Sequence, residues 1–184
     1  MGMVVPEALF ETIGNNSNQK YVVNHAVVIS PKIDGKSSDY EEWGKSSFYK
    51  PGTSGGTMHQ VSTIVKSFNY GFNADNLYLK VDFNEESLTG FSLKIIFLKP
   101  VETIIILSFD LENKILVIDG QGKNMDVANG IFNKSVEFAL PFSSLGFPEE
   151  YENIKFAISV NKNNSEIERW PYQSTIEIPK PVKV

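Results

Sequence analysis

The chain contains no cysteine and is poor in arginine and histidine. The absence of cysteine excludes thiol nucleophiles, cysteine-ligated zinc, iron–sulfur clusters and disulfide scaffolds. Arg169 is the single arginine among 17 basic residues, and arginine is the side chain that holds a phosphate through two parallel hydrogen bonds. Because the net charge is −5 and no basic run is present, the sequence predicts no nucleic-acid partner.

Long apolar segments are also absent. No run reaches the roughly 18 residues that a membrane span needs, so no span is predicted. Residues 1–13 have no basic segment ahead of an apolar stretch, so no signal peptide is predicted and the compartment is left open. A chain of 184 residues suits one domain, which forms its core without help from a disulfide or a metal.

Most of the chain consists of short segments in which apolar residues alternate or β-branched residues dominate. This pattern predicts an all-β protein, an antiparallel β-sandwich of two sheets with jelly-roll or immunoglobulin-like character. Pro6 and Gly14 bound a short N-terminal helix over residues 6–13, so residues 1–19 are predicted as a helix or linker and residues 20–184 as the sandwich. Residues 32–60 are predicted as a long loop. The predicted strands are residues 21–30, 61–70, 77–83, 91–98, 103–109, 114–118, 136–140, 154–160 and 175–178.

Few residues suggest catalysis. Neither His25 nor His59 is accompanied by a serine motif, a second histidine at metal-ligand spacing or a phosphate-binding glycine loop, so no catalytic residue is predicted. A carboxylate pair of the glycosidase type meets in space, and sequence alone does not exclude it. The acidic group around residues 39–42 is typical of a solvated turn. Alternatively, Asp34 and Asp39 with a backbone carbonyl form a calcium site, because calcium favours oxygen ligands on loops.

The aromatic residues divide into two groups. The chain has 13 Phe, 7 Tyr and 2 Trp, and most Phe fall on alternating strand positions that predict a core. A smaller group is predicted in loops, beside acidic residues and the single arginine. Exposed aromatic faces suit sugar rings, whereas a buried tryptophan that anchors the fold is the alternative for Trp43. The predicted ligand-binding residues are Trp170, Arg169, Trp43, Tyr49 and Tyr172.

A series of short motifs, in order along the chain, resembles one known module. They are ISPKIDG (29–35), DYEEW (39–43), GGTMH (55–59), FNYGFN (68–73), NLYLKVD (76–82), VEFALPFSSLG (136–146), ERWP (168–171) and the strand at 175–179. Together they resemble the glucodextranase-type C-terminal module that follows the catalytic region of many family 57 glycoside hydrolases. That module is related to family 9 carbohydrate-binding and DOMON-like sandwiches. In one departure, Glu41 stands where the family often has an aromatic residue.

The resemblance implies a non-catalytic carbohydrate-binding or accessory module, associated with an α-glucan-acting enzyme of the amylase, amylopullulanase or glucodextranase type. Its implied partners are an upstream catalytic domain and a polysaccharide or oligosaccharide, and its implied cofactor is structural calcium. Two alternatives stay open. An interdomain-packing sandwich without sugar binding predicts an exposed apolar patch near the N-terminal segment and burial of both tryptophans. A DOMON-like haem domain predicts Met58, His59 or His25 as axial ligands. A stand-alone enzyme is the remaining class.

Overall fold

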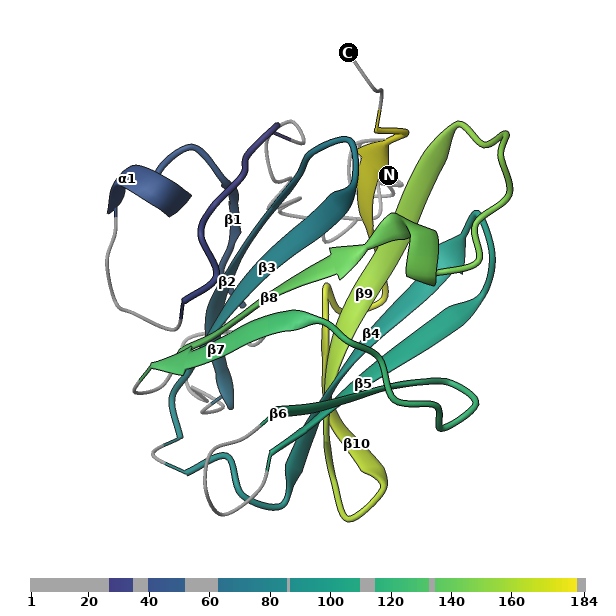
Figure 1. The fold of residues 1–184 in the computed structure, drawn as a ribbon. Helices are drawn as coiled ribbons and strands as arrows, with labels where there is room; N and C mark the ends of the chain where they lie inside the picture. The colour runs from purple at the N-terminus through teal and green to yellow at the C-terminus, as the bar shows by residue number, and fades with distance from the viewer. Residues whose placement is uncertain are drawn as a thin grey trace, which may run out of the picture.

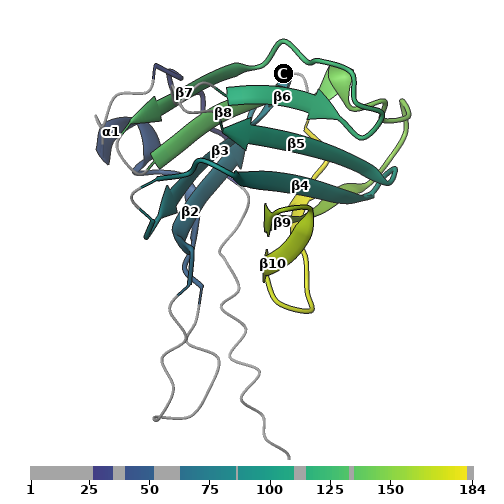
Figure 2. The same ribbon diagram turned by 90° about the horizontal axis from the view of Figure 1, so that it is seen from below.

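The computed structural model describes residues 27–34, 40–51, 63–85, 87–109, 115–132 and 135–181. These residues form two antiparallel sheets that pack face to face (Figures 1 and 2). The prediction of an all-β sandwich is therefore confirmed. The helix expected at residues 6–13 and the boundary expected at residue 20 lie outside the described residues.

Each sheet mixes strands from distant parts of the sequence. In the first sheet the order is β1-β2-β3-β8-β7, and in the second it is β10-β9-β4-β5-β6, with β11 also paired to β9. Most strands are joined to a sequence neighbour by a short connection (Figure 1). The strands are β1 (Ser47–Tyr49), β2 (Val65–Phe72), β3 (Asn76–Phe83), β4 (Phe91–Lys99), β5 (Thr103–Phe109), β6 (Ile115–Asp119), β7 (Ala128–Phe132), β8 (Ser135–Pro141), β9 (Asn153–Lys162), β10 (Ser165–Trp170) and β11 (Ile176–Pro179).

The core lies between the sheets and is rich in phenylalanine. Phe68 and Phe138 enter it from the first sheet, and Phe97 and Phe156 enter it from the second. The ring of Tyr70 meets that of Phe156 edge to face across the interface, with centroids 5.9 Å apart. Such aromatic contacts add to the apolar area that burial removes from water, which is the main stabilising contribution in a sandwich of this kind.

The two long sides of the sandwich are closed in different ways. On one side the chain passes from β6 to β7, and the Met125 N–H donates to the Val117 carbonyl at 2.9 Å. On the other side Glu168, from β10 of the second sheet, reaches the start of β2 in the first. One carboxylate oxygen accepts the Ile64 N–H, and the other accepts the Val65 N–H at 3.1 Å. A single side chain therefore ties the two sheets together.

A β-bulge at Ile167 makes this contact geometrically feasible. Strict alternation would place Glu166 and Glu168 on the same face of β10. The register instead shifts between them, so that Glu166 pairs with Asn161 and Glu168 pairs with Val160. The extra residue of a bulge reverses the side chains that follow it. Glu168 consequently points toward the first sheet, whereas Glu166 stays on the outer face.

The strand predictions agree with the structure where alternation is regular. The described part of the segment predicted at residues 61–70 and the segment at 77–83 contribute to the β2–β3 hairpin, whose turn is held by the Asn73 carboxamide oxygen accepting the Asp75 and Asn76 N–H groups. β1, β7 and β10 were not predicted. β1 has only three residues, β7 contains Asn129 and Gly130, and the bulge in β10 breaks its period.

Residues 27–31 lie beside the end of β2 at Phe72, beyond the residues of β2 that pair with β1. The Ile29 N–H donates to Phe72, and the Phe72 N–H donates to Val27. Gly71 permits this approach, because a Cβ there would lie 2.6 Å from the Ile29 side chain and 2.9 Å from the Val27 carbonyl oxygen. A larger residue at position 71 would push this segment away from the sheet.

We expect Glu168→Ala to destabilise the protein by about 2–3 kcal/mol, because it leaves partly buried N–H donors unsatisfied at the edge of the sandwich. Glu166→Ala is the matched control, since it removes an acidic residue of the same strand whose ion pair is solvent-exposed and worth about 1 kcal/mol or less. Urea unfolding of both variants measures the difference. Equal losses of unfolding free energy would contradict the role given to Glu168.

Candidate functional site

The structure does not bring the five predicted ligand-binding residues together. Trp43 ends the single-turn helix α1 (Tyr40–Trp43) over the outer face of the first sheet and is 5% exposed. Tyr49, predicted in a loop, lies instead in β1 with its ring stacked on Phe68 in the core.

The other three residues lie at or near the end of β10. Trp170, also predicted in a loop, is half-buried against the core, and its indole N–H donates to Glu168 at 3.1 Å. Arg169 lies on the outer face of the second sheet, opposite Ser159. Tyr172 follows in the next turn and is 64% exposed. Arg169 therefore stands apart from Tyr49, which is in the first sheet, and from Trp43, which packs on that sheet.

The predicted cation site is described only in part. Asp34 forms an ion pair with Lys32 at 3.2 Å, and Asp39 lies outside the described residues. Within the described ranges, no group of three or more histidine or acidic side chains is arranged to hold a metal ion. The haem-ligand candidates His25, Met58 and His59 also fall outside these ranges.

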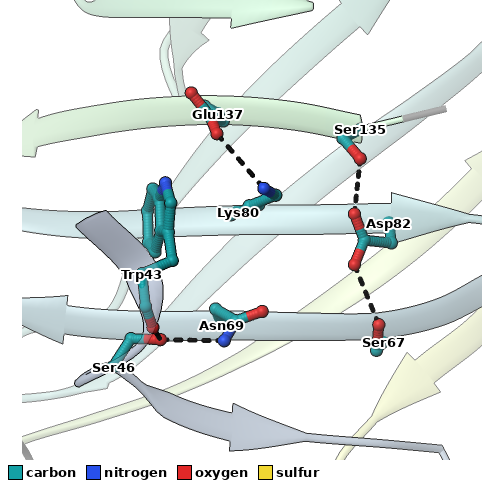
Figure 3. A network of polar contacts seen from close by, with 8 residues as sticks. All are labelled: Trp43, Ser46, Ser67, Asn69, Lys80, Asp82, Ser135 and Glu137. Carbon is teal, nitrogen blue, oxygen red and sulfur yellow. Dashed lines mark hydrogen bonds and ion pairs between the residues drawn. The ribbon is translucent and has the colours of Figure 1, made fainter. Parts of the chain in front are cut away.

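A polar network crosses the outer face of the first sheet (Figure 3). The Asp82 carboxylate on β3 accepts the hydroxyls of Ser67, on β2 at 3.0 Å, and Ser135, on β8. Next to it, the Asn69 amide donates to the Ser46 hydroxyl at 2.8 Å, and that hydroxyl donates to the Trp43 carbonyl at 2.6 Å. These bonds hold three strands and the end of α1 in a fixed relation.

Glu137 is the buried acid of this network. Its carboxylate lies 3.5 Å from the Lys80 ammonium, and Figure 3 shows the Trp43 indole lying across β3 with its nitrogen on the side of β8. The buried Trp43 N–H makes no hydrogen bond of normal geometry in the described structure. Burial raises the pKa of Glu137, whereas Lys80 and the Trp43 N–H lower it and the charge of Asp34 raises it further. Trp43 packs with Tyr78 and Ala139 and so holds the end of α1 against the sheet.

The second sheet carries an open groove on its outer side, with a volume of about 820 Å³. Its lining comes from β4 and β5, the turn between them, the end of β6, the residues around η2 (Phe142–Ser144) and β10. Arg169 is the one predicted ligand-binding residue that lines it. Elements distant in the sequence thus contribute to one concave surface.

The floor of this groove is aliphatic. Ile96 on β4 faces Ile104 on β5, and Leu98 and Val101 continue the surface toward the turn. Leu98, Val101 and Ile104 are 39–40% exposed. The same apolar face extends beyond the groove to Ile106, Ile118 and Leu116. Exposed apolar groups gathered on one face typically mark a binding surface.

Polar groups surround this floor. The Arg169 guanidinium donates to Glu166 through Nε at 2.9 Å and Nη2 at 2.8 Å, which lowers the pKa of Glu166 and leaves Nη1 without a protein partner among the described residues. Asp119 accepts the Gln121 and Lys123 N–H groups with Oδ1, both at 2.9 Å. Its Oδ2 is without a partner in the described ranges. The lining therefore offers the Arg169 guanidinium as a cationic donor, the carboxylates of Asp119 and Glu102, and the Gln121 carboxamide.

The sequence contained a signal for this surface, namely strands that are apolar on both faces, but the prediction of strands from their alternation did not use it. A strand with one solvent-exposed face alternates apolar and polar residues. Residues 95–98 (IIFL) and 104–107 (IIIL) are instead apolar on both faces. Their outward members include Ile96, Ile104 and Ile106. Asp119 and Gln121 belong to no recognisable sequence motif. They line the groove because of the turn at the end of β6, and the sequence pattern gave no signal for that position.

A scan against protein-family models, a search of curated proteins and a search of solved structures found no match for this chain. In the described part of the chain, no helix has the length and apolar character needed to cross a membrane.

Glu137 predicts a specific pH dependence of stability. Because its native pKa lies above the ordinary value of 4.5, the native state binds more protons than the unfolded state between these two values. Glu137 therefore makes its whole stabilising contribution to the unfolding free energy below pH 4.5. This contribution is lost as the pH rises from 4.5 through the native pKa of Glu137. We expect Glu137→Gln to remove this decrease. Urea unfolding across pH 4–8 tests it, with the exposed Glu177→Gln as control. An unchanged slope in Glu137→Gln would contradict the assignment.

Proposed function

We propose that the chain is a non-catalytic carbohydrate-binding module, and that its ligand occupies the groove on the outer face of the second sheet. The observation that carries this proposal is the joint presence of an aliphatic floor and a polar rim in one open concave surface. A sugar ring has the same dual character, since its C–H faces are apolar and its edges carry hydroxyl groups. Binding sites generally combine an apolar lining with a few fixed polar groups.

The rim groups match the hydrogen-bonding capacity of hydroxyls. One sugar hydroxyl would accept from Arg169 Nη1, a different hydroxyl would donate to Asp119 Oδ2, and the Gln121 carboxamide both donates and accepts. Arg169 is held in place by its two bonds to Glu166, so less side-chain entropy is lost when a ligand binds. The groove is open, which suits a segment of a longer chain.

We further propose that the module serves a glycoside hydrolase acting on α-glucans, with a catalytic domain upstream. This part rests on the motif resemblance, which makes maltodextrins and dextrans the first ligands to test. Structural calcium at Asp34 and Asp39 remains a prediction from the same source. Metal analysis of the purified protein after dialysis addresses it directly.

Interdomain packing is the second candidate function, and the extended aliphatic face favours it. Leu116, 52% exposed on β6, lies on this face outside the groove. Packing against a neighbouring domain would cover Leu116 together with the groove, whereas sugar binding needs only the groove. The two functions therefore differ in whether the isolated chain binds a sugar.

We expect Arg169→Ala to weaken oligosaccharide binding at least tenfold, because a hydrogen bond from a charged donor contributes about 1.5–3 kcal/mol. Gly120→Val should weaken it similarly, since a Cβ at position 120 lies over Ile104, 3.4 Å from its carbonyl oxygen, and the larger side chain fills the groove. Isothermal titration calorimetry against a panel of maltodextrins and dextrans measures both effects.

Phe48→Ala is the matched control for this experiment. Phe48 is an exposed aromatic on β1, on the outer face of the first sheet. Its substitution should leave binding unchanged. Loss of binding in Phe48→Ala together with normal binding in Arg169→Ala would move the site to the other sheet and contradict the proposal.

A further inference from the structure

Two polar residues are buried on the outer face of β9. Ser159 is 0% exposed and Asn161 is 2% exposed. Both point away from the core, because Ile158 and Val160, the residues that alternate with them, belong to it. The Asn161 carboxamide donates to the Ser159 hydroxyl at 3.0 Å. Buried polar groups need hydrogen-bond partners, so the side chains that lie beside this pair determine what it does.

The neighbouring side chains on β10 are the two members of an ion pair. Arg169 is the cross-strand partner of Ser159, and Glu166 is the cross-strand partner of Asn161. The bulge at Ile167 produces this match, because it lets two residues of β10 that are three apart oppose two residues of β9 that are two apart. The Glu166–Arg169 ion pair therefore lies alongside the Asn161–Ser159 hydrogen bond on the same face of the sheet.

The Glu166 carboxylate links the two pairs. The hydrogen bonds from Arg169 are the largest influence on it and lower the pKa of Glu166, whereas partial burial raises it. The Ser159 hydroxyl and the charge of Lys94 lower this pKa further, and Lys94 lies on β4 directly opposite Ser159. Groups from β10, β9 and β4 thus act on one carboxylate and restrict its position.

A fixed carboxylate in turn fixes the arginine. The guanidinium is planar, and its Nε and Nη2 both donate to Glu166, at 2.9 and 2.8 Å, so the direction of Nη1 follows from the position of the carboxylate. Because Arg169 lines the groove, Nη1 is the donor available to a ligand. A side chain that is already ordered loses less entropy when the ligand binds.

We propose that Ser159 and Asn161 are positioning residues, which fix Glu166 and through it hold the Arg169 guanidinium in the orientation that binds the ligand. Neither residue lines the groove, so both act without touching the sugar. This inference rests on the proposed carbohydrate-binding function and assigns the residues that prepare its cationic donor.

The Nε–H signal of Arg169 in a ¹⁵N NMR spectrum measures this positioning without a ligand, since the chain has a single arginine. Its pH titration gives the midpoint at which Glu166 takes up a proton and releases the guanidinium. In Ser159→Ala we expect the midpoint to shift to higher pH, because one of the influences that lower the pKa of Glu166 is lost. Asn161→Ala should shift it in the same direction. Glu166→Gln should abolish the transition, which assigns it to this carboxylate.

Affinity is the second measurement. We expect Ser159→Ala to bind maltodextrins and dextrans about three- to tenfold more weakly in calorimetric titration, because the arginine must then be ordered by the ligand itself. Ser108→Ala is the matched control. It removes a serine hydroxyl from the same face of the sheet, on β5 and outside the groove, and should change neither the midpoint nor the affinity. Circular dichroism verifies that each variant keeps its fold.

The outcomes separate this inference from the function on which it rests. A raised midpoint together with weaker binding in Ser159→Ala, with Ser108→Ala unchanged, supports the inference. An unchanged midpoint overturns it, as does a raised midpoint with normal affinity. Either result leaves the carbohydrate-binding function in place if Arg169→Ala loses binding. A wild-type chain that binds none of these sugars at millimolar concentration overturns the proposed function and, with it, the binding role given to Ser159 and Asn161.

Discussion

The Glu168 carboxylate spans the gap between the two sheets and accepts three N–H groups, from Ile64, Val65 and the Trp170 indole. An ionised carboxylate with three donors is well compensated for partial burial, because charge-assisted hydrogen bonds replace its lost hydration. The contact fixes where β10 lies, and β10 carries both Trp170, which faces the core, and Arg169, which faces the groove. The candidate site therefore depends on an interaction made on the opposite side of its own strand. Without the bulge at Ile167, Glu168 would point to solvent and the strand edge would be open.

The fold was predictable where each strand has one buried face. In β3 and β9 alternate residues enter the core, so period-two patterning identified both strands to within two residues at each end. β10 could not be found in this way. Its bulge places Glu166 and Arg169, three residues apart, on the same face, which no regular strand does. A register shift depends on pairing with β9, and that pairing is a tertiary property that the local sequence does not encode.

The candidate site was predictable only in part, and for a similar reason. Arg169 was identified as a ligand-binding residue from its neighbourhood in the sequence, and it lines the groove. Trp43 and Tyr49 were assigned to a loop because residues 32–60 show no period, yet Tyr49 lies in a three-residue strand within that segment. A strand this short has too few positions to establish alternation. Ile96, Ile104 and Asp119 converge through the pairing of β4 with β5 and of β5 with β6, which sequence spacing does not reveal.

The account as a whole places carbohydrate recognition on the outer face of the second sheet. The most direct measurement is a map of backbone amide chemical shifts in the ¹⁵N-labelled chain during titration with an oligosaccharide. The account predicts that the largest shifts occur at Ile104, Gly120, Gln121 and Arg169, with Trp43 and Phe48 unaffected. Shifts centred on Trp43 and Phe48, or no shifts with any sugar tested, would contradict it.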